Sequence, residues 1–572
     1  MNTVYNASVG ATTEGERWSV RGADLPPGVP MRERLLLLRG VAREDWEQFF
    51  VPNPHRTLPK LLGDPLQLPD APIAVERIGR AIRAGESVCI HGDYDADGVT
   101  AAAILVRGLR TLGGDADYYL PHRVNEGFGL SDAGVRAIAA RGCTLLVTAD
   151  CGMTDVGPVA LARTLGLDVI VTDHHALGPA LPEAVAIVNP RRSGDARIFR
   201  HLTGAGTAYM LLRALAYSMP DRGPINGGEM VQLAAIGTVA DMAPLLDENR
   251  LIVRAGLTAM RRQPLPGVRA LASTSRLAVG AVNETDLSFR LGPRLNAAGR
   301  MAHADLACDL LLADDPVVAA RLALRLEALN DKRRACSAQM ALEAEQMIAG
   351  RDALMGDVVA IYRDEWSQAM LGIVAGQLVR TLGVPVIAAA GAAGSVRASV
   401  RSVPGLDVMV GLNDCAEHLQ AFGGHSQAAG FTTTLDGLGK VHARLSELFA
   451  NLRTAGGLEV DAELLPSDLT SALAADLEAM SPFGVGNPEP LFGFKEVRVG
   501  SVRTFGKSNA HLSFNLASAG GPPTEVVGFG MGGLAPDLAR AGRADLVVRP
   551  LRQRSGPYHP LRFALEHAYP LL

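Results

Sequence analysis

Four short apolar runs in the first half of the chain are followed at once by acidic or histidine residues. The runs lead into His91-Gly92-Asp93-Tyr94-Asp95-Ala96-Asp97, Asp150, Asp173-His174-His175 and Asp241. From about residue 76 to 255 such runs alternate with helical stretches, a pattern that predicts βαβ units and a parallel sheet. Open α/β sheets place their chemistry at the carboxyl ends of the strands, so these polar side chains are expected to converge at one sheet edge.

Carboxylates and imidazoles gathered in this way indicate a site for divalent cations, because mixed ligands of this kind suit Mn²⁺ and tolerate Mg²⁺. A calcium loop of the EF-hand type is excluded, since the twelfth position counted from Asp93 is Ile104 and not a glutamate. An Asp-rich surface turn is an alternative for residues 91–98 taken alone. Helix capping, however, would not explain acidic residues after all four runs.

Composition limits the class of protein. At 572 residues the chain is long enough for about three to five domains. A hydrophobic content of 48% and a charged content of 20% are typical of a soluble globular protein. The formal net charge of −5 argues against indiscriminate nucleic-acid binding but permits a local basic groove. The six cysteines have no Cys-x-x-Cys spacing, which argues against a zinc ribbon or a disulfide framework.

No targeting or membrane segment is expected. Residues 1–22 are polar and lack the apolar core of a signal peptide. No apolar run reaches the roughly 18 residues that would suggest a membrane span. A cytoplasmic location without membrane contact is therefore the expectation.

The pattern divides the chain into five segments. Residues 1–75 are expected to be an N-terminal extension packed on the first domain, and residues 76–260 to form the parallel-sheet domain. Residues 261–350 include a predicted long helix that opens at Asp315-Pro316 and ends near Gly350, about 50 Å in length. Residues 351–450 repeat an α/β pattern. Residues 451–572 contain short strands separated by turn residues, which predicts a small β-barrel or sandwich.

Several motifs resemble those of one known group of enzymes. Asp173-His174-His175 and the segment 91–98 resemble the DHH/DHHA1 phosphoesterase superfamily, and within it the RecJ-like single-strand exonucleases. Residues 292–301, GPRLNAAGRM, and 422–430, FGGHSQAAG, are similar to further motifs of this group, as are 482–490 and 506–512. The resemblance covers most of residues 80–530. It implies an α/β fold in which a long helix joins a parallel-sheet DHH domain to a smaller α/β DHHA1 domain, followed by a C-terminal OB-like β-barrel.

The resemblance implies two Mn²⁺ or Mg²⁺ ions in one active site. One ion would take His91, Asp95 and Asp150, and the other Asp97, Asp150, His174 and Asp241, with Asp150 as the bridge. Asp93 and His175 would lie behind the ligands or contact the scissile phosphate. Asp173 would orient the loop. The catalytic set is therefore Asp93, Asp95, Asp97, Asp150, His174, His175 and Asp241.

Two basic segments are candidates for holding a nucleic-acid strand. Arg294, Asn296 and Arg300 are expected in a Gly/Ala-rich turn, where guanidinium groups would clamp phosphates. The alternative is a surface loop whose arginines pair with nearby acids.

By resemblance, Ser399 and Arg401 bind the 5′-phosphate with help from Gly424 and His425, although His425 could equally be a structural histidine. Two positions depart from the family pattern: Val400 replaces a glycine and Ser367 a histidine.

The C-terminal segment is expected to supply a groove that binds single strands without sequence preference, through stacking and basic contacts. The candidates are Phe483, Phe505, Lys507, His511 and Arg503. These aromatic residues could also be barrel core, and for Phe514 and Phe529 a core position is the expectation.

The leading hypothesis is a metal-dependent 5′→3′ exonuclease that degrades single-stranded DNA to nucleoside 5′-monophosphates in DNA repair and recombination. One alternative is a related phosphodiesterase acting on short oligonucleotides or cyclic dinucleotides, and another is a non-catalytic scaffold. The resemblance further implies single-strand binding protein and a RecQ-type helicase as partners, and a monomeric protein.

Overall fold

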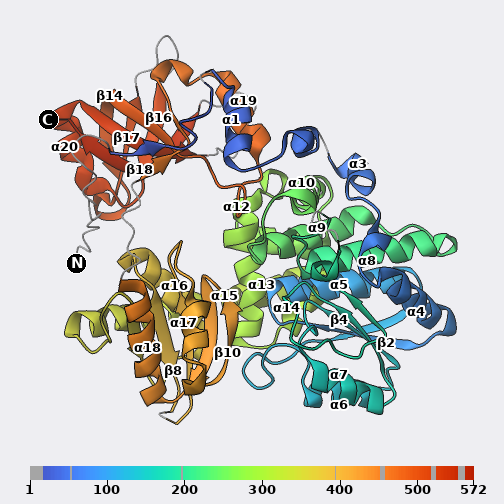
Figure 1. The fold of residues 1–572 in the computed structure, drawn as a ribbon. Coiled ribbons are helices and arrows are strands. Elements are labelled where there is room, and N and C mark those ends of the chain that lie inside the picture. The colour runs from blue at the N-terminus through green and yellow to red at the C-terminus, as the bar shows by residue number, and fades with distance from the viewer. Residues whose placement is uncertain are drawn as a thin grey trace.

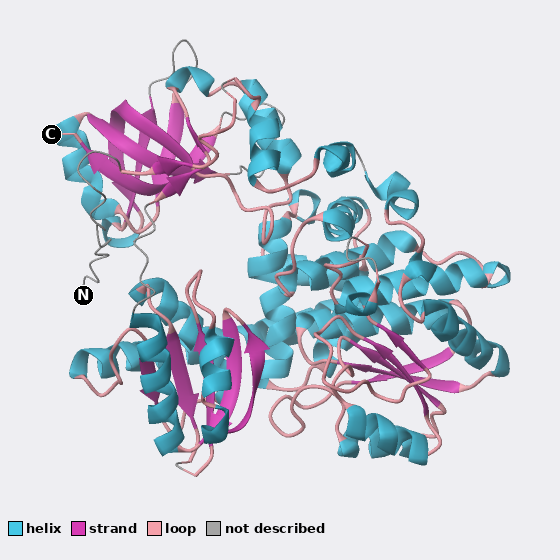
Figure 2. Ribbon diagram, in the orientation of Figure 1, coloured by secondary structure: helices cyan, strands magenta, loops and turns pink. Residues whose placement is uncertain are grey.

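A computed structural model describes residues 17–26, 28–51, 54–194, 198–392, 394–450, 458–516, 523–551 and 561–571 of the chain. Its strands form two five-stranded sheets, one six-stranded sheet and a two-stranded ribbon. Figure 1 shows three bodies: a blue-to-green part around the first sheet, a yellow-to-orange part beside it and a red C-terminal part above. Helices cover the first two sheets on both faces, whereas the C-terminal part is mostly strand (Figure 2).

The first sheet is parallel throughout, in the order β3-β2-β4-β5-β6. Its strands are β2 (Ser87–Gly92), β3 (Asp115–Tyr119), β4 (Leu145–Ala149), β5 (Asp168–Thr172) and β6 (Ala186–Val188). Around it lie α4 (Ala71–Ala84), α5 (Ala96–Thr111), α6 (Asp132–Ala140), α7 (Val156–Thr164) and α8 (Gly204–Ser218). Because β2, β4 and β5 are neighbours, their carboxyl ends meet at one edge. The parallel sheet and three of the four predicted strand ends are thus confirmed.

The fourth apolar run was wrongly expected to be a strand. Residues 236–240 are the last turns of α9 (Gly227–Ala240), in which Met230–Val239 are buried on every side. A helix that is apolar all round has no helical periodicity to distinguish a short part of it from a buried strand. Asp241 therefore follows a helix, and it reaches the sheet edge from outside the sheet.

The helical segment after α9 contains a second element that was predicted wrongly. It comprises α10 (Asp247–Arg262), α11 (Pro266–Thr274), α12 (Glu284–Asp286), the π-helix Leu287–Leu291, α13 (Gly292–Met301) and α14 (Asp305–Leu312). Residues 292–301 were predicted to form a turn but are the helix α13. Gly299 reflects close packing, since a Cβ atom there would lie 2.5 Å from the Tyr94 carbonyl oxygen.

The long connecting helix is confirmed as α15 (Pro316–Gly350), 35 residues in length. The Asp315 side chain caps it by accepting hydrogen bonds from the backbone N–H groups of Val317 and Val318. Leu322 and Leu326 of its first half belong to the core of the first body, whereas Met340 and Ala344 belong to the core of the second. The helix is therefore shared by both bodies.

The second sheet has the order β10-β11-β9-β8-β7, in which only β7 and β8 are parallel. Its strands are β7 (Val359–Tyr362), β8 (Val386–Ala390), β9 (Val396–Arg401), β10 (Leu419–His425) and β11 (Ala428–Thr433). The helices packed on it are α16 (Leu371–Leu382), α17 (Val408–Asp414) and α18 (Leu435–Ala450). The second α/β pattern is confirmed.

The C-terminal strands close into a barrel, because β14 pairs with β15 on one side and with β17 on the other. The barrel strands are β14 (Phe492–Phe505), β15 (His511–Leu516), β16 (Thr524–Gly528), β17 (Arg543–Pro550) and β18 (Arg562–Pro570). β13 (Ala462–Glu463) extends the sheet, and α19 (Ser471–Met480) and α20 (Ala535–Ala541) accompany it. The predicted OB-like barrel is confirmed.

The N-terminal extension was expected to pack on the first domain, but part of it packs on the C-terminal barrel. β1 (Ser19–Val20) pairs with β12 (Glu459–Val460), and Leu35 and Leu36 of α1 (Met31–Leu38) lie in the barrel core. The helices α2 (Trp46–Phe49) and α3 (Pro54–Leu61) then lead to the first body, where Leu58 joins the core. The weak apolar pattern of this segment identifies no partner, which is why the expectation was wrong.

Within the described residues, no helix is both long enough and apolar enough to cross a bilayer.

Candidate metal centre and nucleic-acid interface

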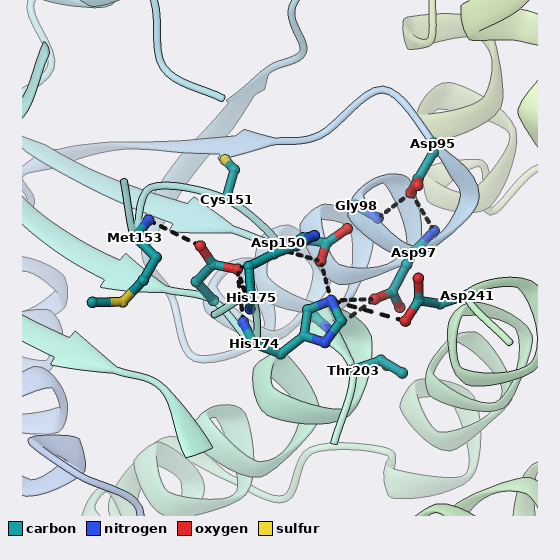
Figure 3. A network of polar contacts seen from close by, with 12 residues as sticks. Asp95, Asp97, Gly98, Asp150, Cys151, Met153, His174, His175, Thr203 and Asp241 are labelled. Atoms are coloured by element: carbon teal, nitrogen blue, oxygen red, sulfur yellow. Dashed lines mark hydrogen bonds and ion pairs between the residues drawn. The ribbon is translucent and has the colours of Figure 1, made fainter. Parts of the chain in front are cut away.

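The ends of β2, β4 and β5, together with the end of α9, bring Asp95, Asp97, Asp150, His174 and Asp241 close to one another (Figure 3). His91 is the fifth residue of β2 and is fully buried, with its ring stacked on that of Tyr119. Asp95 is the N-cap of α5, where its carboxylate accepts hydrogen bonds from the N–H groups of Asp97 (2.9 Å) and Gly98 (3.1 Å). The turn after β2 therefore fixes Asp95 by helix capping and leaves its second oxygen outside these bonds.

Asp97 is held between two helix N-termini. It lies in the first turn of α5, and its carboxylate accepts hydrogen bonds from the N–H groups of Gly204 (2.7 Å) and Ala205 (3.0 Å) at the start of α8. The positive ends of both helix dipoles favour a carboxylate here. Gly237 of α9 lies beside it, since a Cβ atom at that position would be 2.4 Å from Asp97 Oδ1.

Asp150 directly follows β4 and has a φ of +69°, in the left-handed region that non-glycine residues rarely adopt. Its Oδ1 lies 3.0 Å from His174 Nε2. Gly204 allows this approach, because a Cβ atom there would be 2.4 Å from the Cβ atom of Asp150. Backbone strain of this kind is common at functional sites, where the surrounding structure enforces it.

Asp173 organises the histidine loop after β5. Its carboxylate accepts hydrogen bonds from the backbone N–H groups of His174, His175 and Met153, and its Oδ1 lies 2.8 Å from His175 Nδ1. This agrees with the expectation that Asp173 orients the loop. The contact with Asp173 therefore occupies His175 Nδ1.

Three overlapping groups of side chains could hold cations. They are Asp93 with Asp95 and Asp150, Asp97 with His174 and Asp241, and Asp150 with His174 and His175. Within each group the candidate ligand atoms lie within 4.8 Å of one another. Asp150 belongs to two of the groups, and Asp93 stands in the position of a direct ligand in one of them.

Burial and neighbouring charges shift the pKa values of the acidic and histidine side chains at this site. Burial and neighbouring carboxylates raise the pKa of Asp97 to about 7 and that of Asp241 to about 8, and they raise the pKa of Asp150 well above its usual range. Burial lowers the pKa of His91 to about 4 and, together with His175, lowers the pKa of His174 to about 3. Both imidazoles are therefore neutral near pH 7, as metal ligation requires.

The pKa of His175 moves in the opposite direction. Burial alone would lower it, but the hydrogen bond to Asp173 and the charge of that carboxylate raise the pKa to about 9. The contact with Asp173 therefore favours the protonated form of His175.

The residues present fit divalent cations. Among the described residues, four buried ring-nitrogen and carboxylate atoms of this site make no hydrogen bond: His91 Nε2, Asp93 Oδ1, Asp150 Oδ1 and His174 Nε2, the last two of which lie only 3.0 Å apart. Buried polar atoms of folded proteins are almost always hydrogen-bonded, and leaving one unsatisfied costs about 1–3 kcal/mol. Four such atoms at one sheet edge, all able to donate an electron pair, match the ligand set of Mn²⁺.

Two of the predicted phosphate clamps have structural partners instead. Arg294 is buried and forms a bidentate ion pair with Glu327 of α15, with Nη2 2.9 Å from Oε1. This is the alternative that the sequence left open. Asn296 Oδ1 accepts a hydrogen bond of 2.9 Å from the N–H of Ala96 and so supports the turn that carries Asp95 and Asp97.

Arg300 lies in a cationic cluster. Its Nη1 donates to the Ala369 carbonyl oxygen at 2.6 Å, and burial together with the charges of Arg123, Arg333 and Arg401 lowers its pKa to about 9. Arginines brought this close together form a suitable site for phosphate oxygens.

Ser399 and Arg401 lie together on β9, where Arg401 Nη1 donates to Ser399 Oγ at 2.8 Å. Gly372, at the start of α16, faces this pair, since a Cβ atom there would be 2.5 Å from Arg401 Nη2. A hydroxyl, a guanidinium and a helix N-terminus together favour an anion. Val400 points to the opposite face of the strand and is fully buried, so the departure from glycine alters the core and not this face.

His425 ends β10, and its pKa is lowered by partial burial of the imidazole and by the charges of His175 and Arg191. β10 is the edge strand of the second sheet and lies on the side that faces the first body (Figure 1). Gly424 beside it has a φ of +148°, with little room for a side chain. Ser367 is exposed next to the buried Trp366.

The barrel residues divide between core and surface differently from what was expected. Phe483 is only 8% exposed and lies in the barrel core, so its ring is not available for stacking. Phe514 is core, as expected, but Phe529 is 56% exposed, which contradicts the expectation. Phe505 and Phe529 both contact the His511 ring, with centroids 5.2 and 5.7 Å away. The basic candidates Arg503 and Lys507 are exposed in the same region.

Two arginines near the metal centre were missed in the sequence. Arg123 stacks over the Tyr94 ring at 4.5 Å and belongs to the same cluster as Arg300. Arg191 donates from Nε to the His174 carbonyl oxygen at 2.7 Å. Arg123 lies in a turn and Arg191 in the short 3-10 helix Pro190–Arg192, and neither segment is long enough for a periodicity that would distinguish them from ordinary surface arginines.

A parallel sheet with this acidic and histidine edge, a second α/β body and a barrel define a phosphoesterase of the DHH class. Family models agree: the DHH family N-terminal domain matches residues 87–238, the DHHA1 domain matches 356–451 and the RecJ OB domain matches 460–555.

Curated relatives identify the family within this class. The single-stranded-DNA-specific exonuclease RecJ of Dickeya dadantii is 36% identical over 536 residues, which are 89% of this chain and 91% of that protein. RecJ of Bacillus subtilis is 34% identical over 91% of this chain, which spans 65% of that protein's length. A crystal structure of RecJ from Thermus thermophilus in complex with Mn²⁺ has a TM-score of 0.78 at 28% identity, covering 94% of this chain and 76% of that one. The chain belongs to the RecJ family of single-stranded-DNA-specific exonucleases.

Proposed function

We propose that this protein is a metal-dependent 5′→3′ exonuclease that degrades single-stranded DNA to nucleoside 5′-monophosphates. The observation that carries the proposal is the set of buried ligand atoms of His91, Asp93, Asp150 and His174 at one sheet edge, none of which makes a hydrogen bond. A role in DNA repair and recombination follows from the family. The alternative, a phosphodiesterase for short oligonucleotides or cyclic dinucleotides, is not favoured, because the barrel matches the RecJ OB domain.

In this proposal His91, Asp95 and Asp150 hold one ion, and Asp97, Asp150, His174 and Asp241 hold the other. Asp93 lies close enough to Asp95 and Asp150 to be a further ligand of the first ion. Mn²⁺ or Mg²⁺ is the proposed metal, because RecJ of Thermus thermophilus was crystallised with each of them. When bound, two such ions supply an activated water and stabilise the entering and leaving oxygens of the phosphodiester.

The protein's own side chains then position the strand. His175, in the protonated form that Asp173 favours, would donate a hydrogen bond to a non-bridging oxygen of the scissile phosphate. Arg300 and Arg123 would neutralise the adjacent phosphate. Ser399, Arg401 and the N-terminus of α16 would bind the terminal 5′-phosphate, with His425 between this pocket and the metal centre.

Family membership supports further expectations for partners and location. Single-strand binding protein and a RecQ-type helicase are proposed partners, with a monomeric protein in the cytoplasm. The proposed domain bounds, 76–260, 351–450 and 451–572, are supported by three family models that fall almost entirely inside them.

The test is digestion of matched single strands labelled at the 5′ or the 3′ end, with Mn²⁺ and with duplex as a control. The 5′ label is expected to appear at once as a mononucleotide, whereas the 3′ label passes through progressively shorter strands. The Asp150→Ala variant should release neither label while it remains folded. Internal cleavage, release of the 3′ label first, or equal attack on duplex would contradict the proposal.

A further inference from the structure

Three large apolar side chains are exposed where the first body meets the barrel. Phe289 is 75% exposed, Met242 69% and Val485 45%. They belong to three segments distant in sequence: the π-helix before α13, the residue after Asp241, and the connection between α19 and β14. Their exposure is unfavourable unless a ligand covers them, because burial of such side chains is among the strongest contributions to folding and binding.

Contacts made by neighbouring residues bring the three segments close together, and Met242, Phe289 and Val485 are here called the apolar rim. The N–H of Leu245 donates to the Val485 carbonyl oxygen at 2.8 Å. The Glu284 carboxylate, one turn before Phe289, accepts a hydrogen bond of 2.9 Å from the N–H of Phe483. A Cβ atom on Gly292 would lie 3.2 Å from the Cβ atom of Ala240, so the π-helix also abuts the end of α9.

The backbone at two rim positions is unusual. Met242 has a φ of +58°, in the left-handed region that is strained for a residue with a side chain. Phe289 lies in the middle of a π-helix, Leu287–Leu291, a conformation that is rare and frequent at functional sites. Neither distortion buries the side chain, and both leave it in solvent.

The rim is continuous with the metal centre on one side and with the barrel on the other. Met242 directly follows Asp241, whose Oδ2 lies 3.9 Å from His174 Nε2, and Val485 lies in the connection that leads into the barrel strand β14. In Figure 1 α12, which precedes the π-helix, stands where the barrel chain approaches the first body. A strand that runs from the barrel to the cations would therefore pass this surface.

We propose that the apolar rim binds unpaired bases of the substrate strand, with Phe289 stacking on a base beyond the two nucleotides that flank the scissile phosphate. This inference rests on the proposed exonuclease function. Stacking on an aromatic face requires a base whose own face is free, so the rim accepts any base of a single strand and none of an intact duplex. It thereby adds to strand selection a contact close to the reaction, independent of the aromatic residues on the barrel.

The test compares Phe289→Ala with Phe289→Tyr and with Leu324→Ala, a control at a 64% exposed apolar side chain on the long helix α15. Affinity for a 5′-phosphorylated oligothymidylate is measured by fluorescence anisotropy with Mn²⁺, in the Asp150→Ala background that prevents turnover. Phe289→Ala is expected to weaken binding by about tenfold, whereas Phe289→Tyr and Leu324→Ala should bind as the parent does. An abasic site moved along the strand should weaken binding at one or two positions in the parent, and at none of those in Phe289→Ala.

Equal affinity of the parent and Phe289→Ala, or an unchanged abasic profile, would overturn the proposal. It would also be overturned if Phe289→Ala converted a dimer to a monomer in sedimentation, since the rim would then contact a second copy of the chain. Hydrolysis of a dinucleotide, too short to reach the rim, separates the two levels of inference. A parent that cleaves neither dinucleotide nor long strand refutes the exonuclease function, whereas normal cleavage with an unaffected Phe289→Ala refutes the rim alone.

Discussion

Glycines determine how closely the carboxylates of the metal centre approach their neighbours. Gly237 in α9 and Gly204 at the start of α8 both stand where a Cβ atom would come within about 2.4 Å of Asp97 or Asp150. Gly204 also supplies one of the two N–H groups that bind Asp97. The absence of two side chains is therefore as necessary to this site as the presence of the acids.

We expect Gly237→Ala to lower the free energy of unfolding by about 1–3 kcal/mol, since the added methyl group overlaps Asp97 Oδ1 and Thr100 Oγ1 at 2.4 Å. Displacement of Asp97 should also weaken Mn²⁺ binding, as measured by calorimetric titration. The matched control is Gly439→Ala in α18, where a Cβ atom would meet nothing within 4 Å. It should stabilise the protein by up to about 1 kcal/mol through helix propensity. Equal effects of the two substitutions would contradict this account.

At the residue scale the sequence predicted which side chains gather at the sheet edge, because acids after apolar runs have a direct geometric consequence. It did not predict what each arginine touches. Arg294 is neutralised by Glu327, 33 positions away, and such a pairing depends on the packing of α13 against α15. The expectation that Phe529 lies in the core was also wrong. Inward and outward side chains alternate only within a strand, and Phe529 follows the last residue of β16.

Among the elements, α10 joins the first body to the barrel through one side chain. Arg250 is 1% exposed, and its guanidinium donates to the carbonyl oxygens of residues 479–482 and of Phe49. It also lies 3.6 Å from the centre of the Phe49 ring. The barrel segment 482–490, expected from its motif to contact nucleic acid, thus begins as an anchor to the first body.

Arg250→Met is expected to destabilise the junction by about 3 kcal/mol or more, because several buried carbonyl groups lose their donor at once. Calorimetry should then resolve an earlier transition for the barrel, and affinity for single strands should fall while dinucleotide hydrolysis is retained. Arg540→Met, at a 70% exposed side chain of α20, is the control and should unfold like the parent. A single unchanged transition in Arg250→Met would refute the anchor.

The elements themselves were predictable where periodicity or capping was clear, as for α15 and the strands β2, β4 and β5. The two errors have physical causes. The end of α9 is apolar on all sides, so its last residues look like a buried strand. The glycines of α13 look like turn residues, although at least Gly299 is required by the approach of the Tyr94 backbone.

At the scale of the whole molecule, the candidate metal ligands and the candidate nucleic-acid contacts are distributed over three bodies. The first body carries the acidic and histidine edge, the second adds Ser399, Arg401 and His425, and the barrel presents Phe505, His511 and Phe529 at its surface. The helix α15 contributes to the cores of the first and second bodies, and Arg250 anchors the barrel to the first body. The distances between these surfaces therefore depend on a few connections. The order of the bodies was predictable from the sequence, but the N-terminal segment that packs on the barrel was not.

The central claim is that two cations share Asp150 at this edge. The most direct measurement is anomalous scattering from crystals of the protein grown with Mn²⁺. Two peaks about 3.5–4 Å apart are expected, one beside His91, Asp95 and Asp150 and the other beside Asp97, Asp150, His174 and Asp241. A single peak, two peaks without Asp150 between them, or peaks at other acidic residues would contradict the account.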